Sequence, residues 1–358
     1  MSEALKIVIP MAGWGTRMRP QTWSKPKPLV SVGGRTALDY LMDMFESIPN
    51  PRNVEFVFIV GPYLGELQIP PFVAQHYPGI TAHYVVQAEM KGQSHGIYLA
   101  RQFLRGPLIS CFSDTLIDAD FSILDRERSD GLAWVKPVPD PRRFGVAEVN
   151  ADGRVTRLIE KPQSLENNLA LVGCYYFRRS EDLMSAIEEQ MQRGIQLKNE
   201  FFLADAVNIM LEHRALFRTQ KVQTWLDTGT IEATLETNRY MLEKMWAAHP
   251  QVVQRPDVQV VPPVFIHETA QLQSSVVGPH ASIGAGCRIS DSRIEDSILE
   301  PDSLVARAAL RGSLIGRGAT VEGQGLAEVF TLNIGDNSAV RLAGGDRRPP
   351  APDSGKET

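Results

Sequence analysis

The sequence predicts a Rossmann-like α/β domain with a mixed, mostly parallel sheet, followed by a short parallel β-helix. Two observations carry this prediction. Over the first two thirds of the chain, apolar strand-like runs alternate with helical patterns, as in βαβ units on a parallel sheet. From about 264 to 322, apolar residues recur every five or six positions with glycine or small residues between them, which is typical of a solenoid of short strands.

Length and composition place the chain among ordinary globular proteins. Its 358 residues suffice for about two domains of roughly 150 residues, each with its own core. With 43% apolar and 22% charged residues, the chain is neither disordered, collagenous nor a coiled coil. No apolar run approaches the roughly 18 residues of a membrane span, and the start MSEALKIVIP leads into a strand rather than a signal peptide. We therefore expect a cytoplasmic protein with no membrane partner.

The three cysteines, Cys111, Cys174 and Cys287, lie far apart in the sequence and form no CxxC pair. An odd number at such spacing predicts neither a disulfide framework nor a zinc site. We expect reduced thiols, mostly in the core.

Charge is distributed unevenly along the chain. The formal net charge of -5 argues against a nucleic-acid partner, whose binding would rest on a broad basic face. Residues 4–38 nevertheless contain no Asp or Glu. They hold six cations, which predict a local anion site: Lys6, Arg17, Arg19, Lys25, Lys27 and Arg35.

The elements of the first domain follow from hydrophobic periodicity. Nearly continuous apolar runs, such as LKIVIPM, predict strands covered on both faces. We expect such strands over residues 5–11, 54–61, 83–87 and 107–114. Apolar residues at a spacing of three and four predict helices near 37–47, 94–105, 181–193, 199–213 and 230–246. Two alternating runs around Asp152 and Gly153 predict a hairpin within 146–160, which makes the sheet mixed.

Composition sets the predicted boundaries. The first domain covers 1–248, and a proline-rich linker covers 249–263. The β-helix covers 264–340, and the tail 341–358 has the composition of a disordered segment. The residues that we expect to fill the β-helix are Val277, Ile283, Ile289, Ile294, Leu299, Val305, Leu310, Ile315 and Val321.

A glycine-rich segment, MAGWGTRMRP at 11–20, directly follows the first strand. Its glycines therefore lie at the carboxyl end of that strand, where open α/β sheets bind ligands. Gly13 and Gly15 lack a Cβ, so backbone N–H groups can approach a triphosphate, and Arg17 supplies positive charge. Downstream, Lys25 and Lys27 in SKPKPL alternate with prolines that we expect to hold the segment extended.

Together, GxGTRxxP and KPKPL resemble the signature of the sugar-phosphate nucleotidyltransferases, and the resemblance covers about residues 4–245. This family joins a sugar 1-phosphate to a nucleoside triphosphate and releases pyrophosphate, so these two molecules are the expected partners. The resemblance also implies that the solenoid is a left-handed β-helix, as in long members of the family. We further expect a homo-oligomer, formed through the β-helix or the first domain.

The resemblance assigns binding roles to individual residues. Arg17, Lys27 and Lys161 correspond to catalytic cations. The nucleotide would contact Ala12, Gly13, Gly15, Thr16, Gln87 and Gly92. Gln and a following Gly are typical of members that use thymidine or uridine nucleotides, although Gly92-Gln93-Ser94 replaces the usual GTA. Glucose 1-phosphate is the default sugar substrate, and a GTP and mannose 1-phosphate pair is the alternative.

Two carboxylates match the metal ligands of the family. Asp114 ends the apolar run PLISCFSD, with Ser113 in place of the usual Gly, and Asp227 lies in WLDTGT. Two carboxylates together with phosphate oxygens suit Mg²⁺, so the resemblance implies this cofactor.

The sugar phosphate site corresponds to the EKP element in RLIEKP. Glu160 would bind sugar hydroxyls and Lys161 the phosphate, while Gly145 and Gly173 would line the pocket. Glu200 stands where the family has a sugar-contacting acid, but an acid at a helix N-terminus is an equally simple explanation.

Several alternatives stay open at this point. The chain can be an inactive regulatory or scaffold homologue, although Arg17, Lys27, Asp114, Lys161 and Asp227 are all retained. His267 and His280 in the β-helix either serve acyl transfer or lie at surface corners. His95 either contacts the nucleotide or caps the next helix.

Overall fold

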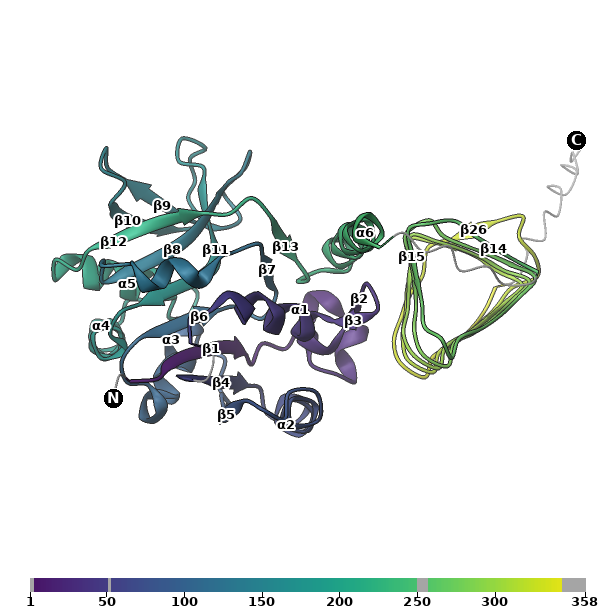
Figure 1. The fold of residues 1–358 in the computed structure, drawn as a ribbon, viewed down its shortest axis with the longest axis horizontal. Coiled ribbons are helices and arrows are strands. Elements are labelled where there is room, and N and C mark those ends of the chain that lie inside the picture. Colours follow the sequence, from purple (N-terminus) through teal and green to yellow (C-terminus); the bar gives the residue numbers. More distant parts are fainter. Residues whose placement is uncertain (1–2, 51–52, 250–256, 343–358) are drawn as a thin grey trace, which may run out of the picture. The chain divides into compact units, whose positions relative to one another are not determined.

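The computed structural model describes residues 3–50, 53–249 and 257–342 (Figure 1). The chain forms two compact units, one ending at Thr237 and the other beginning at Asn238. Both the predicted tail from 343 onward and residues 250–256 of the predicted linker lie outside the described residues.

The first unit is built on a nine-stranded mixed sheet whose main path runs β10-β9-β11-β6-β1-β4-β5, with β8 joined to β11 and β12 joined to β8. β1 pairs in parallel with β4 and β6, whereas β11 runs antiparallel to β6, β8 and β9. The strands are β1 Leu5–Met11, β4 Val54–Val60, β5 Thr81–Val86, β6 Leu108–Cys111, β8 Gly131–Pro137, β9 Gly145–Val149, β10 Val155–Glu160, β11 Leu169–Phe177 and β12 Phe217–Lys221. This topology confirms the predicted mixed, mostly parallel Rossmann-like sheet.

Smaller elements surround this sheet. Two short ladders are formed by β2 Ser31–Val32 with β3 Arg35–Thr36, and by β7 Thr115–Ile117 with β13 Trp225–Asp227. The helices are α1 Ala37–Asp43, α2 Leu64–His76, α3 Gln93–Leu99, α4 Ser180–Gln192, α5 Leu203–Glu212 and α6 Ile231–Ala248. Short 3₁₀ turns are η1 Thr16–Met18, η2 Gln21–Trp23, η3 Lys27–Leu29, η4 Met44–Ser47, η6 Arg101–Phe103 and η7 Phe121–Asp125. None of the helices in the described part of the chain has the length and hydropathy of a membrane span.

The apolar runs of the sequence form strands whose side chains are buried in the core. Ile7, Val8 and Ile9 of β1 are all fully buried, so both faces of this strand are covered, as predicted. On one face, Val8 belongs to the apolar cluster that contains Leu183 of α4 and Val207 of α5. The three cysteines are buried and unpaired, which confirms the prediction of core thiols.

Strand β10 forms one end of the sheet order, and an asparagine covers part of its open edge. Asn208 of α5 accepts a hydrogen bond from the Leu158 N–H and donates one to the Leu158 carbonyl, both at 2.8 Å. Leu158 is 2% exposed, so neither backbone group has water as a substitute partner. Asn208 therefore acts as a short mimic of a neighbouring strand.

The second unit contains three five-stranded parallel sheets that form the three sides of a triangular solenoid (Figure 1). The first sheet holds β14 Val258–Val260, β17 Ser275–Val277, β20 Arg293–Glu295, β23 Ala309–Arg311 and β26 Val329–Phe330. The second holds β15 Val264–Ile266, β18 Ala281–Ile283, β21 Ile298–Leu299, β24 Leu314–Ile315 and β27 Asn333–Ile334. The third holds β16 Gln271–Gln273, β19 Arg288–Ser290, β22 Leu304–Ala306, β25 Thr320–Glu322 and β28 Ala339–Arg341.

The filling of this solenoid confirms the predicted β-helix, and its three parallel sheets are consistent with the left-handed form. Each of the nine apolar residues expected in its interior is at most 2% exposed. At two of the corners, buried serines link successive coils, since the Ser275 hydroxyl accepts from the Ser292 N–H at one corner, and the Ser297 hydroxyl from the Ser313 N–H at another. Each serine thus satisfies a backbone donor that the turn would otherwise leave buried without a partner.

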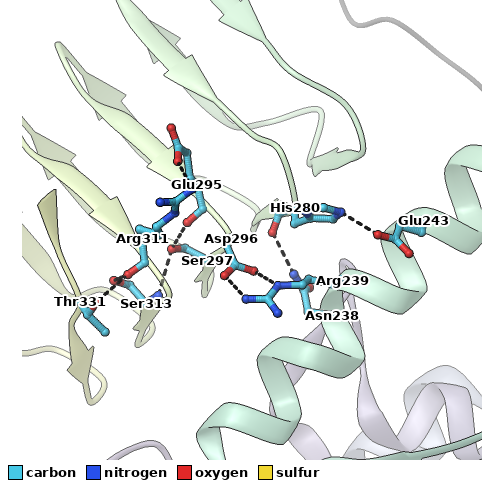
Figure 2. A network of polar contacts seen from close by, with 10 residues as sticks. All are labelled: Asn238, Arg239, Glu243, His280, Glu295, Asp296, Ser297, Arg311, Ser313 and Thr331. Carbon is cyan, nitrogen blue, oxygen red and sulfur yellow. Dashed lines mark hydrogen bonds and ion pairs between the residues drawn. The ribbon is translucent and has the colours of Figure 1, made fainter.

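The last turns of α6 belong to the same unit and bind the second and third coils of the β-helix (Figure 2). Arg239 forms a two-bonded ion pair with Asp296. Asn238 donates to the His280 carbonyl, and the His280 ring lies 3.0 Å from a Glu243 carboxylate oxygen. The imidazole of His280 is therefore engaged in attaching the helix, and the ring of His267 contacts the Thr269 hydroxyl at 2.9 Å.

Three elements differ from the predictions. Strand β14 lies inside the predicted linker 249–263 and already pairs with β17, so the β-helix begins earlier than its composition indicated. Helix α2 was not predicted because Pro70 and Pro71 lie inside it. Helix α5 begins at Leu203 rather than near 199, since Lys198 and Asn199 have φ values of 53° and 64°, outside the helical region.

Replacing Asn208 with Leu should destabilise the first unit by about 1–3 kcal/mol, because the Leu158 N–H and carbonyl would both stay buried without partners. The check is chemical denaturation followed by near-ultraviolet circular dichroism. Gln192→Leu, an amide-to-leucine change at an exposed position, is the matched control. Equal midpoints for the two variants would contradict the assigned role of Asn208.

Candidate active site

A cavity of about 450 Å³ opens at the carboxyl ends of β1, β5 and β6. This is the edge where open α/β sheets bind ligands, and the volume suits a small-molecule substrate. Ten of the sequence-predicted site residues line it: Ala12, Gly13, Gly15, Thr16, Arg17, Lys27, Gln87, Gly92, Asp114 and Glu200. The segments that contribute them are far apart in the sequence, so the fold brings the residues predicted to bind a nucleotide together at one cavity.

The glycine loop enters this cavity through a tight turn. Gly15 has φ +58°, and a Cβ at this position would lie 2.9 Å from the Thr22 side chain. The Thr22 hydroxyl in turn donates to the Gly15 carbonyl at 2.8 Å, which fixes the start of η1. The loop therefore needs glycine at this position to present its backbone to the cavity.

Only part of the predicted cation cluster faces the cavity. Arg17 and Lys27 line it, whereas Lys6 pairs with Glu55 at 2.7 Å and Arg35 with Asp43 at 2.5 Å. Arg19 and Lys25 are not among the lining residues. The segment SKPKPL is not extended throughout, because Lys27–Leu29 forms a 3₁₀ turn that follows an extended Pro26. The predicted anion site thus rests on two of the six cations.

The two predicted metal carboxylates come together through the small β7–β13 ladder. Asp227 pairs with Thr115, the residue after Asp114, and the Thr228 N–H donates to the Asp114 carbonyl at 3.3 Å. Gly229 lines the cavity, and a Cβ on it would lie 2.8 Å from Asp227 Oδ1 and 3.3 Å from Arg17 Nη2. Asp227 itself does not line the cavity, but it pairs with Thr115, whose neighbour Asp114 does line it.

The pKa values of the two carboxyl groups, Asp114 and Asp227, shift in opposite directions. Lys27 Nζ lies 2.5 Å from Asp114 Oδ2. Burial works against ionisation of Asp114, but the Lys27 ammonium outweighs it and lowers the pKa of this carboxyl below its ordinary value. Burial, with the negative charge of Asp114 next in effect, raises the pKa of Asp227. Asp114 and Asp227 therefore lie close enough for each charge to act on the other, and Lys27 and Arg17 are the cations that act to lower the pKa of both.

The donor set therefore fits a hard divalent cation. Mg²⁺ binds through one or two carboxylates and completes its shell with water and phosphate oxygens. No group of three or more His, Cys, Asp or Glu side chains arranged for a metal occurs in the described ranges. Asp114 and Asp227 are the two carboxylates by which this site could hold such an ion.

Of the predicted sugar residues, Glu200 lines the cavity, whereas Gly145, Glu160, Lys161 and Gly173 are not among its lining residues. The Cβ position of Gly145 is 3.0 Å from Glu160 Oε2, and that of Gly173 is 2.6 Å from the Phe112 ring, which lines the cavity. Burial raises the pKa of Glu160, Lys161 lowers it, and nearby acids add to the rise. Lys161 Nζ lies 3.6 Å from the Glu160 carboxylate.

Glu200 lines the cavity from a loop, and the alternative of a helix N-terminal acid is wrong. It precedes Phe202, the N-cap of α5, and Leu197 exchanges backbone hydrogen bonds with it. Lys161 Nζ stands 5.0 Å from the centroid of the Phe202 ring. The loop before α5 thus links the sugar residues to the cavity.

His95 does neither of the things that the sequence left open. It lies within α3, whose N-cap is Gly92, and it does not line the cavity. Its Nδ1 accepts from Gln87 Nε2 at 3.3 Å, while the same Nε2 donates to the Gly92 carbonyl at 3.0 Å. Burial lowers the pKa of His95, which favours the neutral ring that can accept this bond. His95 and Gly92 therefore hold Gln87 in place.

Sequence reasoning missed several lining residues, among them Trp14, Met90, Gln93 and Phe112. Met90 and Phe112 carry no motif, and only the fold shows that they face the cavity. Gln93 had a signal, since it lies in the segment that replaces the usual GTA. Trp14 had a visible signal, since a large aromatic residue between two glycines of a binding loop has no packing reason to be there.

Comparison with known proteins identifies the family. The model of the family "Nucleotidyl transferase" matches residues 6–244. The chain is 29% identical to a glucose-1-phosphate thymidylyltransferase from Streptomyces antibioticus, over 94% of this chain and 99% of the relative. It is 27% identical to a "Probable mannose-1-phosphate guanyltransferase" from Schizosaccharomyces pombe, over 90% and 86% of the two chains.

Solved structures agree on the fold. A nucleoside-diphosphate-sugar pyrophosphorylase from Vibrio cholerae superposes with a TM-score of 0.56 and 21% identity, over 65% of this chain and 99% of that chain. Because the family match spans the whole sheet and both carboxylates, the resemblance found in the sequence is confirmed. The chain belongs to the nucleotidyl transferase family.

Proposed function

We propose that the chain transfers a nucleotidyl group from a nucleoside triphosphate to a sugar 1-phosphate and releases pyrophosphate. One observation carries the proposal: the glycine loop, Arg17, Lys27 and the Asp114 carboxylate meet at one cavity, with Asp227 on the strand paired beside it. The names of relatives that align along nearly the whole chain support it.

The chemistry requires charge neutralisation more than proton transfer. A phosphate oxygen of the sugar 1-phosphate attacks the α-phosphorus, and the bond from that phosphorus to pyrophosphate breaks. The attacking oxygen is already ionised, so no general base is needed. Each pair of like charges about 4 Å apart costs roughly 4 kcal/mol at an effective dielectric of about 20, and several such pairs would prevent the approach.

The cations of the site are placed to offset this repulsion. Arg17 and Lys27 line the cavity, where they can bind the oxygens of the triphosphate. Lys161 has φ +48°, and its N–H donates to the Phe144 carbonyl at 3.0 Å, which orients it beside Glu160. In this proposal Lys161 binds the sugar phosphate, and Glu160 with Glu200 binds sugar hydroxyls.

Mg²⁺ is the proposed cofactor, held by Asp114 and Asp227. When bound, it would act as a Lewis acid that neutralises charge on the phosphate oxygens. Lys27 contributes to the same end, because it holds Asp114 ionised and in position.

Thymidine or uridine triphosphate is the proposed donor and glucose 1-phosphate the proposed acceptor. Gln87 and Gly92 support this base class, since both line the cavity and Gln87 is held by two hydrogen bonds. The name of the Streptomyces antibioticus relative supports the same pair.

The direct test is pyrophosphate release by the full chain with Mg²⁺, with dTTP, UTP, CTP, GTP and ATP each combined with a panel of sugar 1-phosphates. We expect release that requires both substrates and is fastest with dTTP or UTP and glucose 1-phosphate. Release only with GTP and mannose 1-phosphate would favour the alternative pair. No release from any pair would reject the enzymatic function and favour an inactive homologue.

Asp114→Asn and Asp227→Asn should each lower turnover by about 100-fold or more, because each removes a proposed metal ligand at the reacting phosphates. Steady-state kinetics over a range of Mg²⁺ concentrations gives the measurement. Asp118→Asn, an exposed carboxylate on the same segment, is the matched control and should be unaffected. Near wild-type turnover in either site variant would refute the metal assignment.

Lys161→Ala should raise the KM for the sugar 1-phosphate by roughly 10-fold to 100-fold, the effect of losing a charge-assisted hydrogen bond. The KM for the triphosphate should stay within about twofold, as judged against the exposed-lysine control Lys221→Ala. Unchanged saturation by the sugar phosphate would exclude the assigned role of Lys161.

A further inference from the structure

Trp14 is exposed in a loop that otherwise offers only small and charged groups to the cavity. It lies between Gly13 and Gly15, lines the cavity and keeps 51% of its surface exposed. A Cβ at Gly13 would meet no atom within 4 Å, so the loop is open next to the indole. An aromatic side chain buries about 150–250 Å² when it is covered, so leaving it in water beside a ligand site forgoes a large favourable contact.

The other groups of the cavity narrow down which part of a ligand would cover this indole. In the proposed function, Arg17 and Lys27 bind the phosphate oxygens. The indole of Trp14 could offer those oxygens only one hydrogen-bond donor, its N–H. Its flat apolar face complements a flat, weakly polar group. In a nucleoside triphosphate that group is the base. The same cavity is lined by Gln87 and Gln93, whose amides suit the polar edge of a base rather than its face.

We infer that Trp14 stacks on the nucleobase of the donor triphosphate. The inference rests on the proposed function. Since every base has a π-face, the stack would add affinity shared by all bases, and edge contacts near Gln87 would provide the discrimination. Trp14 is then a substrate-positioning residue that places the α-phosphate by holding the far end of the donor.

The test compares three variants of the full chain: Trp14→Ala, Trp14→Phe and Trp23→Ala. Trp23 is the matched control, because it is 66% exposed in the same segment but does not line the cavity. Calorimetry with Mg²⁺ measures the affinity for dTTP, UTP and inorganic tripolyphosphate, which has the phosphates without the base. Thermal unfolding verifies that each variant is folded.

Stacking predicts that Trp14→Ala weakens dTTP and UTP binding by between about 5-fold and about 150-fold, without changing tripolyphosphate binding. Trp14→Phe should recover most of the loss, and Trp23→Ala should bind like the wild type. In kinetics, Trp14→Ala should raise the KM for the triphosphate far more than it lowers kcat.

Equal losses for dTTP and tripolyphosphate would overturn the inference, since the indole would then act on the phosphates. Unchanged affinities would overturn it too. Either result leaves the proposed transfer reaction intact, whereas a wild-type chain that binds no triphosphate rejects the proposed function and the stack together.

Discussion

The ion pair between Lys27 and Asp114 connects the parts on which the site depends. Lys27 comes from the 3₁₀ turn that follows the glycine loop, and Asp114 from the carboxyl end of β6. Burial works against the charged form of Asp114, and the ammonium offsets this effect and lowers the pKa of the carboxyl, which favours the ionised form that a hard cation binds. The same contact thus keeps the carboxylate charged and brings the loop to the edge of the sheet. Asp227 joins through backbone pairing with Thr115, and its carboxylate accepts a hydrogen bond from the Gly229 N–H at 2.7 Å.

The features predicted correctly are those that depend on neighbouring residues or on apolar residues that recur at a short spacing. The run at β1 and the interior residues of the β-helix are correct because burial follows directly from apolar spacing. The predicted position of the glycine loop, at the carboxyl end of β1, is correct because its motif directly follows the apolar run of that strand. Helix α2 was missed for the same local reason, since prolines are read as breakers even where the surrounding fold retains the helix. Glu200 was placed near a helix start, but two neighbouring residues with positive φ keep it in a loop.

What could not be predicted depends on partners distant in the sequence. The resemblance singled out Lys27 rather than Lys25, but nothing in SKPKPL reveals that Lys27 forms an ion pair with Asp114. Likewise, His95 looked like a candidate for ligand contact until the fold placed it behind Gln87 as an acceptor. In both cases the side chain's chemistry allows several partners, and the sequence does not show which partner it meets. Only the three-dimensional arrangement of strands decides this, because local propensity is the same for each.

The attachment of α6 to the β-helix has a consequence for how this chain can vary in length. The helix contacts His280, Ser282 and Asp296, which lie in the second and third coils, whereas the strands of the fifth coil pair in parallel with those of the fourth. Whole coils can therefore be gained or lost at the far end without disturbing the anchored helix, provided that the strand register is kept. The early coils are not free in this way, since they carry the residues that bind the helix. The second unit thus has coils that must be kept because they bind α6, and an opposite end at which coils can be added or removed.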